Sequence, residues 1–257
     1  MAWGAIPLVL AVLAACSDSP AGPGESAEPT AQPSTTTAPA PSTTAPAPST
    51  TRPAPPPSTA APATTAPAVP AFSGVAVRVT AADLPASWRP GCPVTPADLR
   101  RLELSYWGFD DRPHAGALIV NASQADKIIG VFKRLYEKRF PIRRMEPIDV
   151  YGGSDDASIA ADNTSGFNCR NAVASGPPTW SQHAFGMAID VNPVENPYIL
   201  DGDVLPPAGR EFVDRRNVRP GMALRGGELV AAFAEAGWSW GGVWANPDYQ
   251  HFSAAGN

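Results

Sequence analysis

The spacing of apolar residues along the chain predicts two helices. Between Ser123 and Pro141, large apolar side chains recur every three or four positions, which is the period of one helix face. The residues on that face are Ile128, Ile129, Phe132, Leu135 and Tyr136. Ser123, with Asp126 three positions later, fits an N-terminal capping box, and Pro141 ends the segment.

The second helix is predicted over residues 227–236. Its buried face would carry Leu229, Val230 and Phe233, again at helical spacing. Gly237 follows directly, at the position where a left-handed residue commonly closes a helix.

Several short runs are apolar, or alternate between apolar and polar residues, and these runs predict strands. They cover residues 75–80, 116–121, 148–151, 187–191 and 238–240. Two helices among short strands, in no βαβ order, indicate an α+β domain with a small antiparallel sheet and flanking helices. The Pro- and Gly-rich residues 192–220 are expected to form a long surface loop, of the kind that often borders a functional site.

This patterning is confined to the later part of the chain. Residues 17–70 are almost all Pro, Ala, Thr and Ser, without Ile, Leu, Phe, Trp or Tyr. Such a segment cannot bury enough apolar surface to offset the entropy of ordering its backbone, so it should stay unfolded. We therefore expect one folded domain, residues 71–257, behind a tether that reaches at most ~170 Å when fully extended.

Residues 1–16 form an apolar segment that is too short to span a bilayer and has the composition of a secretory signal. Its end, Leu13-Ala-Ala-Cys16, resembles a bacterial lipobox, in which the cysteine is acylated and becomes the N-terminus. Acylation of Cys16 would hold an exported protein on the outer face of the cytoplasmic membrane. No Lys or Arg precedes the apolar run, which departs from the usual signal pattern. The alternative to a lipobox is an ordinary signal peptide with an incidental cysteine.

Charge and cysteine content narrow the partners and the chemistry. The chain has a net charge of −5 and no basic stripe, which argues against nucleic acid as a partner. Beyond Cys16 there are two cysteines, Cys92 and Cys169. In an exported domain they most simply form a disulfide, and the alternative is two buried free thiols. Neither lies in a Cys/His cluster of the kind that binds a metal.

Candidate metal ligands come from the three histidines, His114, His183 and His251. Two of them, His183 and His251, join Asp190 to offer the two nitrogens and one carboxylate of a catalytic zinc site. Gly186 would let the chain bend so that His183 and Asp190 converge. The His-x6-Asp spacing alone is weak, because a structural histidine beside an aspartate gives the same pattern. His114 precedes a predicted strand and has either a structural role or one in lining the substrate site.

The wider pattern around these residues resembles a known enzyme family. Ser181 begins the motif Ser-x-His-x-x-Gly-x-Ala-x-Asp, and Trp240 and Asp248 begin Trp-Gly-Gly-x-Trp and Asp-x-x-His-Phe. Together they resemble the zinc D-alanyl-D-alanine carboxypeptidase and L-alanyl-D-glutamate peptidase family. That family includes phage endolysins and shares its fold with the hedgehog signalling domain. The resemblance covers roughly residues 116–252 and implies this fold.

The resemblance implies a role for each matching residue. By position, His183, Asp190 and His251 would bind one zinc ion per chain. Asp248 would be the general base, since a carboxylate near the metal can take a proton from water and return it to the leaving amine. In a regular strand Asp248 and His251 would face opposite sides, and the turn signal at Asn246-Pro247 would resolve that conflict.

The family also carries an arginine after a Ser-Gly-Tyr element, upstream of the first histidine. The corresponding stretch is Ser165-Gly-Phe-Asn-Cys-Arg170, with Phe in place of Tyr and a longer spacing. By this resemblance Arg170 would stabilise the negative charge that develops on the oxygen of the scissile carbonyl. The alternative is an arginine paired with a surface carboxylate.

The implied function is the hydrolysis of peptide bonds in peptidoglycan stem peptides, by a monomeric, lipid-anchored enzyme in the cell-wall space. The motifs look closer to the L-alanyl-D-glutamate endopeptidase branch, and a D-alanyl-D-alanine carboxypeptidase stays open. A rival interpretation is a zinc-stabilised wall-binding lipoprotein without turnover, which would have no use for a base at Asp248. A third possibility is a solute-binding lipoprotein, which shares the lipobox but is usually longer than this chain and two-lobed. Trp238, Trp240 and Trp244 either line a groove for the substrate or belong to the core.

Overall fold

The computed structural model describes residues 70–173 and 177–256. These residues belong to the unit Ala63–Asn257. The predicted signal segment with Cys16 and residues 17–69 of the predicted tether lie outside the described part of the chain. Among the described helices, none combines the length and the apolar character needed to cross a membrane.

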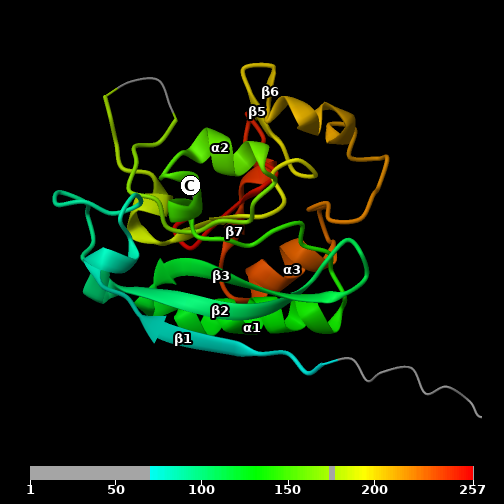
Figure 1. The fold of residues 1–257 in the computed structure, drawn as a ribbon. Helices are drawn as coiled ribbons and strands as arrows, with labels where there is room; N and C mark the ends of the chain where they lie inside the picture. The colour runs from blue at the N-terminus through cyan, green and yellow to red at the C-terminus, as the bar shows by residue number, and fades with distance from the viewer. Residues whose placement is uncertain (1–69, 174–176, 257) are drawn as a thin grey trace, which may run out of the picture. The chain divides into compact units, whose positions relative to one another are not determined.

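The first sheet has three antiparallel strands in the order β1-β2-β3 (Figure 1). They are β1 (Gly74–Arg78), β2 (Leu99–Trp107) and β3 (Pro113–Asn121). β1 and β3 confirm two predicted strands, and β2 is an addition. The sequence pattern misses β2 because Arg100, Arg101 and Glu103 interrupt its apolar positions. Its Leu102 lies opposite Leu118 of β3, and both side chains are fully buried.

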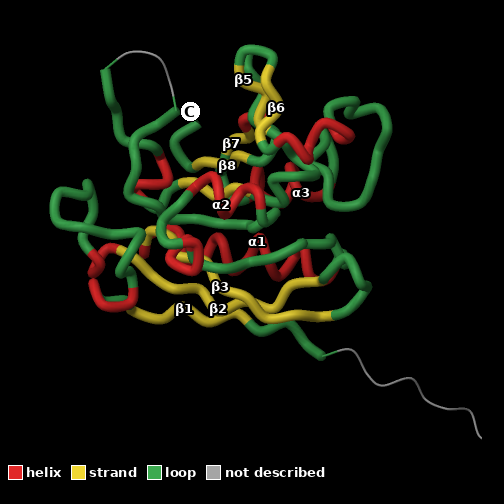
Figure 2. Tube along the Cα trace, turned by 45° about the horizontal axis from the view of Figure 1, so that its top comes forward, coloured by secondary structure: helices red, strands yellow, loops and turns green. Residues whose placement is uncertain are grey.

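Both predicted helices are present. Helix α1 (Ala125–Glu137) packs against the first sheet, and α3 (Glu228–Glu235) packs against α1 (Figures 1 and 2). Phe132 of α1 meets Phe233 of α3 edge-on, with ring centroids 6.3 Å apart. Gly237 takes a φ of 81° after α3, as the predicted C-terminal cap requires.

The predicted N-terminal cap of the first helix is wrong. Ser123 lies in a short 3-10 helix, η3 (Ala122–Gln124), and α1 begins only at Ala125. Asn121, at the end of β3, caps that turn. Its Oδ1 accepts hydrogen bonds from the backbone N–H of Ser123 at 3.1 Å and from the Ser123 hydroxyl at 2.8 Å. The Ser123 hydroxyl is therefore engaged by Asn121, and the N-cap residue of α1 makes no side-chain cap.

The second sheet has the order β4-β8-β7. Its strands are β4 (Ala188–Asp190), β8 (His251–Ser253) and β7 (Ser239–Trp240). β4 and β7 confirm predicted strands. Ile189 lies opposite Phe252, and the Phe252 ring stacks on Phe233 of α3 with centroids 4.2 Å apart. One hydrophobic core therefore joins both sheets with α1 and α3.

Residues 148–151, predicted as a strand, form a 3-10 helix, η4 (Ile148–Tyr151). Gly152 ends it with a φ of 64°, and Val150 is 63% exposed, so this apolar run is not a buried strand. A short helix that the pattern did not predict follows, α2 (Asp155–Ala160). The remaining 3-10 helices of the described residues are η1 (Ala81–Asp83), η2 (Pro96–Asp98), η5 (Gln182–Phe185), η6 (Pro207–Phe212) and η7 (Gly241–Val243).

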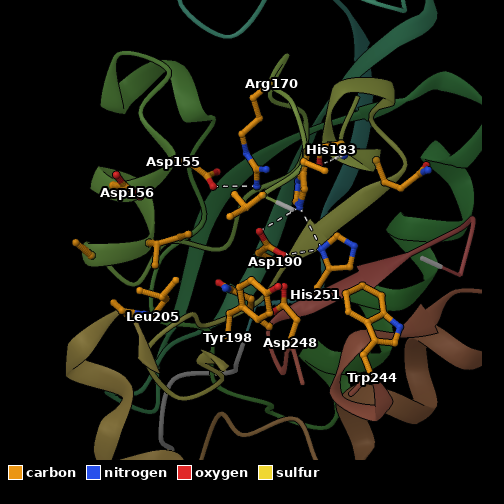
Figure 3. Close-up of a pocket in the computed structure, with 18 of the residues that line it drawn as sticks. Asp155, Asp156, Arg170, His183, Asp190, Tyr198, Leu205, Trp244, Asp248 and His251 are labelled. Carbon is orange, nitrogen blue, oxygen red and sulfur yellow. Dashed lines mark hydrogen bonds and ion pairs between the residues drawn. The ribbon is translucent and has the colours of Figure 1, made fainter. Parts of the chain in front are cut away.

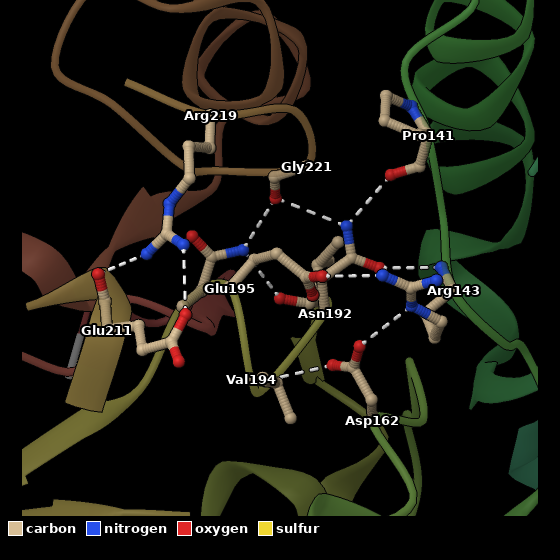
Figure 4. A network of polar contacts seen from close by, with 11 residues as sticks. Pro141, Arg143, Asp162, Asn192, Val194, Glu195, Glu211, Arg219 and Gly221 are labelled. Carbon is tan, nitrogen blue, oxygen red and sulfur yellow. Dashed lines mark hydrogen bonds and ion pairs between the residues drawn. The ribbon is translucent and has the colours of Figure 1, made fainter. Parts of the chain in front are cut away.

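The prediction of a long surface loop at residues 192–220 is correct only in part, because residues 201–220 are largely exposed but the stretch is not irregular throughout. This stretch contains the hairpin of β5 (Tyr198–Leu200) and β6 (Asp203–Leu205), followed by η6. Its first residues are buried in a polar network (Figure 4). There Asn192 Nδ2 donates to the carbonyl of Pro141 at 2.8 Å, and Arg143 Nη2 donates to Glu195 Oε1 at 3.0 Å. These bonds fix the stretch to the segment that follows α1.

Candidate metal and catalytic site

Three residues that are far apart in sequence meet beside the second sheet. In the β4–β8 ladder, Asp190 lies directly opposite His251. His183 comes from η5, and Gly186 at the end of η5 turns the chain with a φ of 66°. A Cβ at Gly186 would lie 2.6 Å from the backbone nitrogen of Asn121, so the bend against β3 requires glycine. The expected convergence of His183 and Asp190 across Gly186 is present.

The donor atoms of these residues face one another (Figure 3). Asp190 lies between the histidines, with Oδ2 3.1 Å from His183 Nε2 and Oδ1 3.1 Å from His251 Nδ1. The two nitrogens are 3.3 Å apart, and all three side chains are buried. A tetrahedral zinc ion with bonds of about 2.0–2.1 Å sets its ligand atoms roughly 3.3 Å apart. In ligand type and in spacing, the cluster fits one zinc ion.

The backbone fixes the direction of the His183 ring. Nδ1 of this ring lies 2.7 Å from the carbonyl oxygen of Gly166, so Nδ1–H donates there, and in the neutral ring Nε2 keeps its lone pair toward the cluster. His183 Nε2 and Asp190 Oδ2 are then two acceptors 3.1 Å apart. Two acceptors this close repel each other unless a proton or a cation lies between them. This contact is a second indication that the cluster suits a cation.

The charges in the cluster also favour a cation. Burial alone raises the pKa of Asp190, but the charges and hydrogen bonds of His183 and His251 outweigh burial and hold this pKa well below its usual range. Burial lowers the pKa of His183, and the charge of Asp190 outweighs that effect and raises it. Asp190 is therefore an ionised carboxylate that depends on nearby positive charge.

Asp248 lies in the same cavity, in the bend that precedes β8 (Figure 3). It pairs with Tyr198 of β5 in an isolated antiparallel bridge. Because Asp248 is outside the regular strand of His251, both side chains can line one cavity. Asp248 Oδ1 is buried and has no hydrogen-bond partner among the described residues. Burial, and then the charge of Asp190, raise the pKa of Asp248 to about 7, so it can exchange a proton near neutral pH.

Arg170 borders the cavity, where a carboxylate holds it. Nη2 lies 2.9 Å from Asp155 Oδ2, at the start of α2, and Nη1 donates to the carbonyl of Asn171 at 3.2 Å. Figure 3 shows the Arg170 guanidinium between Asp155 and the side of the cluster that His183 forms. Arg170 therefore has a carboxylate partner, as the interpretation of a paired arginine predicts. It also borders the cavity, as a role in stabilising the carbonyl oxygen requires.

The cavity has a volume of about 670 Å³. Besides the cluster, Asp248 and Arg170, its walls include Asp155, Tyr198 and Gln250, which sequence reasoning did not identify. The first two come from α2 and β5, elements that the hydrophobic pattern did not predict. Gln250 lies inside the Asp-x-x-His motif, and that position was the signal available for it.

His114 lies outside this cavity wall. Its Nε2 is 2.8 Å from Asp110 Oδ1, and its ring stacks on Tyr106 with centroids 5.4 Å apart. These contacts favour the structural interpretation of His114.

The tryptophans divide between the two interpretations. Trp238 and Trp240 are buried in the core. Trp244 lines the cavity, with its ring 5.3 Å from the ring of His251.

Cys92 and Cys169 form a disulfide, as predicted, across a separation of 77 residues. The segment around it is also hydrogen-bonded. The Cys169 N–H donates to the Ser87 carbonyl at 3.0 Å, and Arg89 Nη1 donates to the Cys169 carbonyl at 2.8 Å. These contacts fix the backbone directly before Arg170.

Comparison with known proteins agrees with the motifs. Residues 175–254 match a family model described as D-alanyl-D-alanine carboxypeptidase. The match includes the three cluster residues and Asp248, and it confirms the resemblance over that segment. No curated protein and no solved structure matches the chain. The α+β architecture with small antiparallel sheets is confirmed, and the hedgehog-type fold stays a prediction.

Proposed function

We propose, from the match to the D-alanyl-D-alanine carboxypeptidase family, that this protein is a zinc peptidase that hydrolyses peptide bonds in peptidoglycan stem peptides. One observation carries the proposal: three buried donor atoms converge in the same cavity as Asp248. The family match supports a peptidase that acts on peptidoglycan. Zinc dependence and the identity of the bond go beyond that match.

The cluster supplies the ligands for zinc. His183 Nε2, one carboxylate oxygen of Asp190 and His251 Nδ1 would hold the ion. When bound, zinc supplies a Lewis acid that polarises the scissile carbonyl and lowers the pKa of water. Gly166 keeps the His183 ring oriented through its hydrogen bond at Nδ1.

Asp248 would carry the proton. Its Oδ1 is buried and has no partner among the described residues, and Asp248 lines the cavity in which the attacking water would lie. A carboxylate at this position takes a proton from the attacking water and later gives it to the leaving amine. The raised pKa of about 7 suits both transfers at neutral pH.

Arg170 would stabilise the carbonyl oxygen as negative charge develops on it. Asp155 and the Asn171 carbonyl already hold the two terminal nitrogens of its guanidinium. The cation is therefore fixed before substrate binds, and a fixed charge costs no reorganisation during the reaction.

The location and assembly proposed for the protein rest on the sequence. Cys16 would carry the lipid anchor, residues 17–70 would span the gap to the wall, and the enzyme would act as a monomer. The rival function, a wall-binding lipoprotein without turnover, gives no reason for an unpaired buried carboxylate oxygen at Asp248, which costs free energy.

The test is digestion of purified muropeptides by the zinc-loaded protein, with the products weighed by mass spectrometry. We expect fragments whose masses identify the bond, no fragments after chelation, and recovery with added Zn²⁺. The variant His183→Ala should lose both zinc and activity, and His114→Ala, outside the cavity wall, should keep both. If wild type releases no fragment from any muropeptide, the binding-protein interpretation replaces this one.

A further inference from the structure

The described residues that line the cavity carry more negative than positive charge. Among its described lining residues are four carboxylates, those of Asp155, Asp156, Asp190 and Asp248, and one cationic side chain, Arg170. Asp155 is paired with Arg170 at 2.9 Å. The two positive charges of a bound zinc ion would balance Asp190 and Asp248. The charge of Asp156 is left. Arg170 is paired with Asp155 and is assigned above to the carbonyl oxygen, so no further Arg or Lys among the described lining residues is left for a free carboxylate on the substrate.

One amide in the same cavity is unusual. Gln250 is 3% exposed, and its Oε1 is buried without a hydrogen-bond partner among the described residues. Buried amides are nearly always hydrogen-bonded, because an unmade bond costs free energy. Asn163 is typical: its Oδ1 accepts from the N–H of Glu146 at 2.9 Å, and its Nδ2 donates to the Glu146 carbonyl at 2.9 Å.

The position of Gln250 is fixed next to the reacting groups. The backbone carbonyl oxygen of Gln250 accepts a hydrogen bond from the Val191 N–H at 3.0 Å. It lies between Asp248 and His251 in the sequence, and all three residues line the cavity. A side-chain amide offers both an acceptor and donors, and a peptide group offers the complementary carbonyl and N–H.

We propose that the cavity selects a peptide whose groups next to the scissile bond are uncharged amides, and that the Gln250 carboxamide binds one of its peptide groups. The proposal rests on the peptidase function proposed above. It names the substrate class as an internal or amidated segment of a stem peptide, not a segment with a free carboxylate beside the bond. The unpaired amide supplies the hydrogen bonds, and the excess carboxylate in the wall disfavours the charged alternative.

The first test uses matched stem peptides that differ only in the group beside the cleaved bond, which is a free carboxylate in one and a carboxamide in the other. For the zinc-loaded, full-length protein we expect kcat/KM to be roughly tenfold higher for the amide. The preference should shrink in Asp156→Asn, because the uncompensated charge is removed. An equal rate, or a preference for the carboxylate, would overturn the proposed selectivity.

The second test compares two glutamines changed in the same way. Gln124 is also buried, but its Oε1 accepts from Trp238 Nε1 at 3.3 Å and its Nε2 donates to Ser123 Oγ at 3.2 Å. Gln124→Met should lower Tm and leave KM unchanged. Gln250→Met should leave Tm unchanged or raise it, because no protein hydrogen bond is lost, and should raise KM roughly tenfold with zinc content intact.

The outcomes separate the two proposals. A lower Tm in Gln250→Met, together with an unchanged KM, would make Gln250 a structural amide and overturn its assignment while peptidase activity stands. Failure of wild type to cleave any muropeptide would overturn the peptidase function itself, and the selectivity with it.

Discussion

Asp190 and Asp248 are two aspartates in one cavity whose surroundings move their pKa values in opposite directions. Asp190 has both histidines as partners, and they hold its pKa well below the usual range despite burial. Burial and the charge of Asp190 disfavour the ionised form of Asp248, so its pKa rises to about 7. One carboxylate therefore stays ionised and can hold a cation, and the other can exchange a proton.

Asp248→Asn tests this division of roles. The variant should keep the fold and the zinc, because Asp248 lies outside the three-donor cluster. Turnover should fall by about 10²–10⁴, the usual contribution of a general acid–base group. Atomic emission gives the zinc content and muropeptide digestion gives the rate. Asp110→Asn, outside the cavity wall, is the matched control and should change neither. Loss of zinc from Asp248→Asn would show that Asp248 is a ligand.

At this scale, the sequence identified residues whose chemistry is carried by their type and spacing. Histidine and aspartate are recognisable as metal donors, so His183 and Asp190 stood out before their geometry was known. Gln250 did not, because its interest lies in a missing hydrogen-bond partner that only three dimensions reveal. Asp155 was missed for a similar reason, since its partner Arg170 is distant in sequence.

At the scale of elements, the periodicity of apolar residues predicted those elements that form within one continuous segment of the chain. Helix α1 has its apolar stripe within one continuous segment, and the stripe alone predicted it. The antiparallel pairing of β4 with β8, which places Asp190 opposite His251, joins segments too far apart for any local pattern to register. The wrong cap at Ser123 has the same origin, since the end of β3 supplies the competing side chain of Asn121.

The second prediction concerns the disulfide between Cys92 and Cys169. It joins the coil around Cys92 to the segment that leads into Arg170. Replacing both cysteines by serine should lower the free energy of unfolding by roughly 4 kcal/mol, since the bond closes a loop of 77 residues. Urea unfolding of oxidised wild type and of the double variant measures this difference. Two free thiols per folded domain in oxidised wild type, from titration after denaturation, would contradict the bond.

At the scale of the whole domain, stability depends on a buried acid in the network of Figure 4. Glu195 has a side-chain exposure of 3%, and it accepts from Arg143 through Oε1 while Oε2 has no partner among the described residues. Burial, and then the nearby Asp162 carboxylate, raise the pKa of Glu195 from an ordinary 4.5 to about 7. The folded state therefore favours the protonated form of this side chain.

This shift predicts how stability changes with pH. Between about pH 4.5 and 7 the folded chain binds a proton at Glu195 that the unfolded chain has lost, so the contribution of Glu195 to stability falls as pH rises. From pH 5 to pH 8 the free energy of unfolding should fall by about 1–3 kcal/mol less in Glu195→Gln than in wild type. Urea unfolding at both pH values measures this difference. Glu211→Gln, at an exposed acid, is the control and should follow wild type. Equal pH dependence in wild type and Glu195→Gln would contradict the shift.

The last prediction concerns where the whole molecule is held. We propose that Cys16 of Leu13-Ala-Ala-Cys16 is lipidated and that residues 17–70, whose composition predicts an unfolded tether, let the domain reach the wall from the membrane. A lipobox cysteine carries more than one acyl chain, and two chains anchor stably where one is marginal. Wild type should therefore be found in the membrane fraction and incorporate labelled fatty acid. Cys16→Ser should lose the label and leave the membrane fraction, with its muropeptide activity unchanged because Cys16 precedes the folded domain. An unlabelled wild type, with both proteins equally soluble, would favour the ordinary signal peptide.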